Sequence, residues 1–424
     1  CYERGVWRMR DEMKKVPRLR FRGFSEDWEH RKVEELGDTF TGLTGKTKED
    51  FGHGDATFVT YINVFSNPIT DLKMTESVEI DAKQNQVEYG DIFFTTSSET
   101  PEEVGMSSVW LGNEANVYLN SFCFGYRPVT ELAPYYMAFM LRSPNVRKKF
   151  IFLAQGISRY NISKNRVMDI EIPVPNIDEQ RKVGQFFKDI DDLITLHQRK
   201  LEQLKELKKT YLQVMFPRKD ERVPKLRFAD FEGEWAQRKL GEISTHRSGT
   251  AIERYFTEDG KYKVISIGSY GTDSKYVDQG IRAISNEITN ARVVHKGELT
   301  MVLNDKTSDG AIIGRSLLIE SEEEYVINQR TEIISPKDDF NVNFAYTTLN
   351  NTFRQKVKKI VQGGTQIYVN YPAVKNLMLD FPSYKEQTKI GTFFKQFDDT
   401  ITLHQNKLDQ LKTLKKTYLQ NMFI

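Results

Sequence analysis

Cysteine is scarce in this sequence, with only Cys1 and Cys123 among 424 residues. Two cysteines cannot form the disulfide framework of a small secreted domain, nor can they supply a structural zinc site built on thiolates. The first twenty residues are polar and basic and do not resemble a signal peptide. We therefore expect a protein of the reducing cytoplasm.

Long apolar runs and an excess of one charge are also missing. No stretch approaches the roughly 18 apolar residues that a membrane-spanning helix needs, and the mean hydropathy is -0.55. We therefore expect no membrane partner. Lys and Arg number 61 against 59 Asp and Glu, for a formal net charge of +2. Any nucleic-acid site must therefore be a local concentration of basic side chains.

Motifs that carry catalysis are absent as well. Gly45-Lys46-Thr47 resembles the end of a phosphate-binding loop, but that pattern requires glycine where Phe40 stands. No glycine-rich loop follows a predicted strand as a dinucleotide or S-adenosylmethionine would require, and no His/Cys cluster has the spacing of metal ligands. The chain also lacks an Asn-Pro-Pro-aromatic run and a Pro-Asp dipeptide, which amino-methyltransferase and nuclease signatures contain. The sequence predicts no catalytic residue and no metal site.

What the sequence does contain is an internal repeat. Val16–Phe21 recurs as the similar Val223–Phe228, and Pro175–Phe216 recurs as Pro382–Phe423 with about 29 identities over 42 positions. Both pairs are separated by 207 residues, so two whole units follow each other. The interiors diverge, although Gly90-Asp91-Ile92 still aligns with Gly297-Glu298-Leu299 at the same offset. One fold used twice with different residues predicts two related binding tasks.

The repeat divides the chain into six segments. They are an N-terminal extension (1–15), a first globular domain (16–174), a first helical region (175–216), a linker (217–222), a second globular domain (223–381) and a second helical region (382–424). The extension lies outside the repeat, and because the sequence starts at Cys1 it is an open question whether the extension is native. Short β-rich runs separated by Gly, Asn, Asp and Ser give both interiors a mixed character. The expected fold class is α/β (mixed α+β), with two similar domains separated by two long helices.

Both helical regions carry a heptad seam, because apolar residues recur at alternating intervals of four and three. Some 26 residues from Asp191 would span about 39 Å at 1.5 Å per residue. We expect the helices to form an antiparallel coiled coil with each other; the alternative is that each packs on its own domain. The two seam histidines are expected to be structural. The predicted seam comprises Ile190, Ile194, His197, Leu201, Leu204, Tyr211 and Met215, then Phe397, Ile401, His404, Leu408, Leu411, Tyr418 and Met422.

With this repeat, the chain resembles the specificity subunit of type I restriction-modification enzymes. The resemblance rests on Ile172–Gln180, on Phe381-Pro382 with Glu386-Gln387, and on a Lys-Leu-x-Gln-Leu-Lys-x-Leu-Lys-Lys stretch in both helices. Gln155-Gly156 and Gln362-Gly363 also fit the domain pattern of that family. The resemblance covers nearly the whole chain from Val16.

The resemblance implies a non-catalytic subunit with two target-recognition domains, each reading one half of a bipartite site in double-stranded DNA. The helices would set the unread gap and dock two methyltransferase subunits, and two restriction/translocase subunits would join in complexes that cleave DNA. The chain itself would bind no cofactor. S-adenosylmethionine, with ATP and Mg²⁺ for cleavage, would be bound by the partners, and the complex would methylate adenine.

DNA contacts are predicted from residue type. Phosphates need Lys, Arg and small donors, whereas base edges need amides, Arg or hydroxyls. In the first domain the candidates are Lys46, Thr47, Lys48, Thr95, Thr96, Ser97, Ser98, Arg147, Lys148, Lys149, Ser158, Arg159, Tyr160 and Asn161. In the second they are Arg247, Ser248, Thr250, Asn304, Lys306, Thr307, Ser308, Arg354, Lys356, Lys358, Thr365 and Gln366.

Bulk charge limits this prediction. Residues 16–174 contain 17 basic and 22 acidic side chains, a net charge of −5. We therefore expect the first domain alone to bind DNA weakly, with the partners supplying much of the clamp. Two alternatives remain. One is a non-enzymatic protein-binding scaffold with two repeated domains on a coiled-coil rod, and the other is an enzyme with unrecognised motifs.

Overall fold

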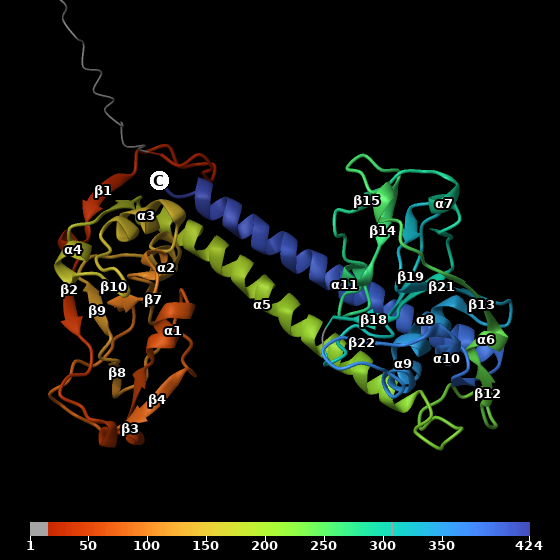
Figure 1. The fold of residues 1–424 in the computed structure, drawn as a ribbon. Coiled ribbons are helices and arrows are strands. Elements are labelled where there is room, and N and C mark those ends of the chain that lie inside the picture. Colours follow the sequence, from red (N-terminus) through yellow and green to blue (C-terminus); the bar gives the residue numbers. More distant parts are fainter. Residues whose placement is uncertain (1–15, 307) are drawn as a thin grey trace, which may run out of the picture. The chain divides into compact units, whose positions relative to one another are not determined.

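The computed structural model describes residues 16–306 and 308–424, which divide into two compact units. Unit 1 comprises the described residues up to Gln198 together with Asn406–Ile424, and unit 2 comprises Arg199–Gln405. Each unit combines a globular α/β domain with a part of each long helix, α5 (Ile177–Val214) and α11 (Tyr384–Asn421) (Figure 1). The C-terminal residues of the chain therefore belong to the same unit as its first globular domain.

Unit 1 is built around an antiparallel sheet in the order β2-β9-β5-β7, beside a three-stranded sheet in the order β4-β3-β8 and two strand pairs, β1·β11 and β6·β10. The strands are β1 (Glu29–Lys32), β2 (Gly37–Thr41), β3 (Phe51–Val59), β4 (Thr75–Val78), β5 (Ile92–Thr95), β6 (Ser97–Ser98), β7 (Ser107–Val109), β8 (Val117–Leu119), β9 (Cys123–Pro128), β10 (Tyr160–Asn161) and β11 (Glu171–Val174). The short helices are α1 (Tyr61–Ser66), α2 (Pro134–Met140), α3 (Pro144–Phe152) and α4 (Lys164–Met168), with 3₁₀ turns at Val33–Glu35, Lys48–Asp50 and Pro101–Glu103.

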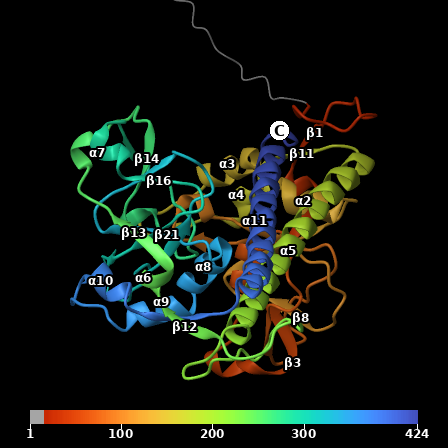
Figure 2. The ribbon, with the colours of Figure 1, turned by 90° about the vertical axis from the view of Figure 1, so that its right-hand side faces the viewer.

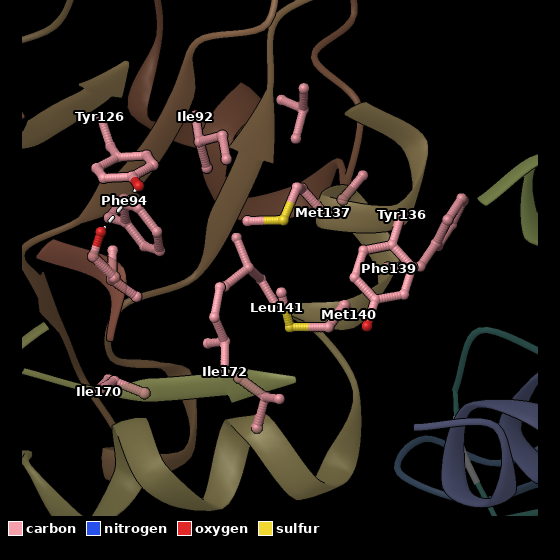
Figure 3. Packing of buried hydrophobic residues seen from close by; sticks show 14 of the residues in the cluster. Ile92, Phe94, Tyr126, Tyr136, Met137, Phe139, Met140, Leu141, Ile170 and Ile172 are labelled. Atoms are coloured by element: carbon pink, nitrogen blue, oxygen red, sulfur yellow. Dashed lines mark hydrogen bonds between the residues drawn. The ribbon is translucent and has the colours of Figure 1, made fainter. Parts of the chain in front are cut away.

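The core of unit 1 lies between the central sheet and helix α2 (Figure 3). Pro134 begins α2, where its missing N–H and fixed φ suit the first turn. Most of the helix is apolar and buried, so it packs against its neighbours on more than one face. Tyr136 is wholly buried, and its hydroxyl donates to the Pro173 carbonyl oxygen over 2.8 Å, which satisfies the one polar atom of this side chain.

Unit 2 repeats this plan. Its central antiparallel sheet has the order β13-β21-β17-β19, accompanied by a sheet in the order β15-β14-β20-β16 and the pairs β12·β23 and β18·β22. The strands are β12 (Ala236–Lys239), β13 (Ser244–Ser248), β14 (Tyr262–Ile265), β15 (Arg282–Ala283), β16 (Val293–Val294), β17 (Leu299–Val302), β18 (Asn304–Asp305), β19 (Ser316–Leu318), β20 (Tyr325–Ile327), β21 (Thr331–Pro336), β22 (Ile367–Tyr368) and β23 (Met378–Phe381). The helices are α6 (Leu240–Ile243), α7 (Glu287–Asn290), α8 (Val342–Asn350), α9 (Thr352–Lys358) and α10 (Tyr371–Val374), with 3₁₀ turns at Glu253–Tyr255 and Ile267–Ser269.

The two long helices run antiparallel within each unit, where they lie side by side in Figures 1 and 2. In unit 1, Lys415 Nζ of α11 lies 2.8 Å from Asp191 Oδ2 of α5. In unit 2 the repeated pair recurs, with Lys208 Nζ of α5 lying 2.6 Å from Asp398 Oδ1 of α11. The predicted antiparallel coiled coil is confirmed.

The predicted seam residues are buried or half-buried along these helices. Those below a tenth exposed are Ile190, Leu201, Met215, Ile401, Leu408, Leu411 and Met422. Those half-buried are Ile194, His197, Leu204, Tyr211, Phe397, His404 and Tyr418. The alternative packing also occurs, because the first turns of each helix enter the core of their own domain through Phe187 in α5 and Phe394 in α11.

The end of the chain closes unit 1. Phe423 is buried against Tyr136 and Phe187, with ring centroids 5.6 and 5.4 Å away. The Leu19 backbone N–H donates to the Asn421 carbonyl oxygen over 2.9 Å. Unit 2 makes the equivalent bond between the residues that the repeat offset of 207 relates to these two: the Leu226 N–H donates to the Val214 carbonyl oxygen, also over 2.9 Å.

Candidate nucleic-acid interface

A tight turn closed by the same backbone bonds occurs in both units. In unit 1, Gln155 and Asn161 exchange two backbone hydrogen bonds of 3.0 and 2.8 Å; in unit 2, Gln362 and Tyr368 exchange two of 2.9 Å. We call the enclosed residues, 156–160 and 363–367, the glycine turns.

Only glycine fits the first position of each glycine turn. Gly156 has φ +140° and Gly363 has φ +99°, in the region that side chains with a Cβ rarely adopt. A Cβ at Gly156 would lie 2.0 Å from the Arg159 carbonyl oxygen, and one at Gly363 would lie 2.2 Å from the Gln366 carbonyl oxygen. The backbone of both turns is therefore fixed in a similar way, whatever side chains follow.

In each unit a short strand pair joins the glycine turn to the segment that follows β5 in unit 1 or β17 in unit 2. In unit 1, Asn161 of β10 pairs with Ser97 of β6; in unit 2, Tyr368 of β22 pairs with Asn304 of β18. The structure thus brings together candidates from separate parts of the sequence. Ser97-Ser98 pairs with Tyr160-Asn161 in unit 1, and Asn304-Asp305 pairs with Ile367-Tyr368, next to Thr365-Gln366, in unit 2. Thr307 lies outside the described residues.

In unit 1 this junction forms a groove of about 530 Å³. The Nη2 of Arg159 donates to Ser97 Oγ over 3.2 Å, and the Tyr61 hydroxyl donates to the Ser97 carbonyl oxygen over 2.6 Å. Burial raises the pKa of Tyr61, so this hydroxyl keeps its proton. The groove is lined by Tyr61, Ile62, Phe65, Ser97, Ser98, Glu99, Glu103, Ser158 and Arg159.

Several of the predicted hydroxyl groups in this region form hydrogen bonds within the protein. Thr95 is buried, and its Oγ1 accepts a hydrogen bond from the Met106 N–H. Thr96 Oγ1 donates to the Phe122 carbonyl oxygen over 2.9 Å, and Ser98 Oγ donates to the Thr100 carbonyl oxygen over 2.6 Å. In the glycine turn, Ser158 and Arg159 are exposed, as is the following Asn161, whereas Tyr160 is half-buried.

The candidates include two basic clusters, 147–149 and 354–358. Their arginines are structural, and this corrects the prediction that they contact DNA. Arg147 is 8% exposed, and its guanidinium donates to the carbonyl oxygens of Gly105 and Glu102 over 2.8 and 3.0 Å. Arg354 is likewise 8% exposed and donates to the carbonyl oxygens of Ile313 and Gly310 over 2.9 and 2.8 Å. Burial lowers the pKa of each guanidinium to about 10. Their donors are directed at loop carbonyls and away from solvent.

Neighbouring lysines behave similarly. Lys149 Nζ donates to the Glu171 carbonyl oxygen over 2.6 Å, and its repeat Lys356 donates to Met378 over 2.9 Å. Lys358 Nζ lies 3.3 Å from the Asp309 carbonyl oxygen. Lys148 is exposed on α3, so it is the one member of the first cluster that faces solvent freely among the described residues.

The remaining candidates lie on other elements. Lys46, Thr47 and Lys48 come from the loop before β3, at the end of the first domain away from β10 (Figure 1). Lys46 Nζ lies 2.9 Å from Asp81 Oδ2, and this contact, with backbone and Gln84 donors, lowers the pKa of Asp81 to about 2. Thr47 is the N-cap residue of the following 3₁₀ turn, and its N–H donates to the Asp50 carboxylate, whereas Lys48 is exposed.

In unit 2 the first group of candidates lies on and just after β13. The Arg247 guanidinium lies 2.7 Å from Glu298 Oε2, and the Ser248 hydroxyl donates to Glu332 over 3.0 Å. Thr250 Oγ1 accepts from Arg292 Nε over 3.3 Å. These side chains are engaged within the unit, although Ser248 and Thr250 remain exposed.

Sequence reasoning missed the apolar part of this surface. Ile157, within the glycine turn, is 96% exposed, and Phe152, just before the turn, is 88% exposed. Phe122, next to Thr96, is 59% exposed, and Ile62 in the groove is 58% exposed. No sequence signal distinguishes these residues from core residues, because exposure depends on the tertiary fold.

Charge differs between the domains. Residues 223–381 contain 21 basic and 21 acidic side chains, whereas residues 16–174 have the net charge of −5 noted above.

Within the described residues, no group of three or more His, Cys, Asp or Glu side chains is arranged to hold a metal ion. None of the described helices combines the length and apolarity that crossing a membrane demands.

Comparison with known families matches both halves of the repeat. The family described as "Type I restriction modification DNA specificity domain" matches residues 25–206 and again 232–413. These two matches cover most of the chain. The chain therefore belongs to the type I restriction-modification DNA specificity family and contains two copies of its domain.

Two curated relatives come from Methanocaldococcus jannaschii. The type I restriction enzyme MjaVIII specificity subunit is 23% identical over 272 residues, which are 62% of this chain and 63% of that protein. The match thus spans less than two thirds of that relative. The putative type I restriction enzyme MjaX specificity subunit is 21% identical over 92% of this chain and 91% of its own length.

Solved structures share the fold. The S subunit of a type I restriction-modification system from M. genitalium superposes with a TM-score of 0.63 at 16% identity, covering 96% of this chain and 99% of the other. A chain from a study of complex assembly and conformational transition of the type I system gives a TM-score of 0.53 at 15% identity, with 92% and 96% coverage.

Proposed function

We propose that this chain is the DNA-reading specificity subunit of a type I restriction-modification complex, with each unit reading one half of a bipartite site. The observation that carries this is the pair of glycine turns. Both have the same backbone closure and the same neighbouring strand pair, yet they present different polar side chains. Two half-sites of different sequence require a constant backbone that carries different side chains.

Two copies of one methyltransferase subunit are the proposed partners. Leu196 and its repeat Leu403 are 62% and 67% exposed, and Leu207 and Leu414 are 44% and 43% exposed. Repeated apolar side chains on polar helices suit two copies of one protein partner better than solvent. In complexes that cleave DNA, two restriction/translocase subunits would join them.

The chain is proposed to be non-catalytic and to act in the cytoplasm. S-adenosylmethionine for adenine methylation, and ATP and Mg²⁺ for cleavage, are assigned to the partner subunits. The absence of a catalytic or cofactor motif from the sequence agrees with this division of labour. The −5 charge of residues 16–174 also agrees with partners that supply much of the DNA clamp.

Selection from random duplex DNA tests the proposal. The chain would be purified with its methyltransferase partner, and the partner alone would serve as the control. We expect enrichment of two fixed sequence elements around an unread gap, and exchange of one globular domain should change one element only. A complex that forms but enriches nothing beyond the control would favour the protein-scaffold alternative.

The helix length is proposed to set the unread gap. Deleting one heptad from both helices shortens each by about 10.5 Å at 1.5 Å per residue, which corresponds to about three base pairs at 3.4 Å per step. The selected gap should shorten accordingly, and an unchanged gap would refute this role of the helices.

A further inference from the structure

The glycine turns present different side chains at one equivalent position. Arg159 in unit 1 and Gln366 in unit 2 are separated by the repeat offset, and each is the third residue after the turn glycine. Both carbonyl oxygens face the glycine in the same way, at 2.0 and 2.2 Å from its added Cβ. The preceding residue keeps its chemistry, with Ser158 in one unit and Thr365 in the other. The turns also differ at Ile157/Gly364 and Tyr160/Ile367, but Arg159/Gln366 is the pair at which both turns carry a long hydrogen-bonding side chain and its chemistry changes.

The side chains of Arg159 and Gln366 are both free to reach a ligand. Arg159 is exposed and makes a single side-chain hydrogen bond, to Ser97, which steadies the guanidinium and leaves most of its donors unused. Gln366 is exposed, and its amide makes no hydrogen bond with any other described residue. Neither side chain has a structural role comparable to that of the buried Arg147.

The two residue types recognise different bases. In the major groove, arginine donates two hydrogen bonds to guanine O6 and N7, and glutamine both donates to and accepts from adenine at N7 and N6. The groove beside Arg159 also contains the exposed Glu99, and a carboxylate can accept from cytosine N4. In unit 2 the residue equivalent to Glu99 is Lys306, which suits a phosphate.

We propose that Arg159 and Gln366 are specificity-determining residues, Arg159 selecting a G·C pair in one half-site and Gln366 an A·T pair in the other. This inference rests on the proposed function, because it names the bases read at the same interface. Arg159 supplies both hydrogen bonds to guanine, with Glu99 placed for the cytosine opposite. Gln366 supplies the paired donor and acceptor for adenine.

Exchange of the two residue types tests the proposal in the intact complex. DNA selection with the wild type, Arg159→Gln and Gln366→Arg should show preference changes at one position each. Arg159→Gln should lower the preference for guanine at one position in one half-site by roughly tenfold to a hundredfold, the discrimination of one bidentate contact. Gln366→Arg should replace adenine by guanine at one position in the other half-site. The remaining positions should keep their preferences.

A modified base and a charge-matched variant sharpen the result. Replacing the selected guanine by 7-deazaguanine, which lacks the N7 acceptor, should weaken wild-type binding and leave Arg159→Gln binding nearly unchanged. Lys148→Gln removes the same charge from the exposed face of α3, and it should weaken binding uniformly and flatten the salt dependence without changing the motif.

The outcomes separate the two proposals. If the wild-type complex enriches no motif, the proposed function itself fails. If the wild type enriches a bipartite motif but both exchanges leave every position unchanged, or weaken all sequences equally, the DNA-reading function stands and the assignment of Arg159 and Gln366 is refuted.

Discussion

The two units satisfy the same repeated acid with arginines from different strands. Asp91 precedes β5 and pairs with Arg127 of β9, whose guanidinium lies 2.8 Å from Asp91 Oδ2. Its repeat, Glu298, precedes β17 and pairs with Arg247 of β13 at 2.7 Å. The fold therefore requires a cation at this place but accepts it either from the adjacent strand, as β9 supplies it in unit 1, or from the edge strand beyond, as β13 supplies it in unit 2. A difference between the units that is compensated in this way concerns stability, whereas the uncompensated difference at the glycine turns points to recognition.

Removal of a buried arginine should have the largest effect on stability. Arg147→Met leaves the carbonyl oxygens of Glu102, Val104 and Gly105 without these donors, and each unsatisfied buried acceptor costs about 1–3 kcal/mol. We expect the free energy of unfolding, measured by urea denaturation, to fall by about 3 kcal/mol or more. Lys148→Met, on the exposed face of the same helix, should change it by less than about 0.5 kcal/mol. Equal losses in both variants would contradict the structural role of Arg147.

The repeated acid allows the comparison to be broken and rebuilt. Asp91 is 1% exposed, so Asp91→Asn should destabilise unit 1 by about 2 kcal/mol, below the usual 3–5 kcal/mol because Arg127 is partly exposed to water. Arg127→Ser should have a similar effect. Adding Phe40→Arg to that variant imitates the arrangement of unit 2 and should recover part of the loss in thermal unfolding. No recovery would mean that the two strands are not interchangeable sources of the cation.

The two repeated tryptophans offer a matched pair of variants. Trp28 Nε1 donates to Glu179 Oε2 over 3.0 Å, whereas Trp235 Nε1 is buried without a partner in the described part of the chain. Trp28→Phe should cost about 1.5 kcal/mol, because it removes a hydrogen bond to a charged acceptor. Trp235→Phe removes no such bond, so chemical denaturation should show a smaller loss. The reverse order would refute this assignment.

Glu332 should introduce a pH dependence into unit 2 only. It is buried on β21, and burial raises its pKa above the ordinary 4.5. The folded state therefore favours the protonated acid, so its contribution is fully present below pH 4.5 and is lost as pH rises through the folded pKa. Glu332→Gln, which stays neutral, should gain stability relative to the wild type as pH rises from 4 to 7. A difference that is constant across this range would exclude Glu332 as its source.

The sequence predicted the repeat, the antiparallel helices and the mixed domains, because these depend on periodicity and spacing. It also selected Ser158, Arg159 and Gln366 as candidates from residue type, but it did not place them on turns, which the structure shows to be exposed. It misjudged Arg147 and Arg354, because a buried arginine that binds carbonyl oxygens has the same sequence signature as a surface arginine. It could not identify Ile157 as exposed, since that depends on which strands surround the turn.

The bond between Leu19 and Asn421 has a consequence for the order in which the protein is made. Unit 2 is one continuous segment, Arg199–Gln405, whereas unit 1 needs Asn406–Ile424 to complete its core. At about 5–20 residues per second, the ribosome spends roughly 10–40 s on the 207 residues between these two parts of unit 1. The domain encoded first is therefore completed last, and a chain that stops a few residues short loses part of the core of its N-terminal domain while its second domain remains whole.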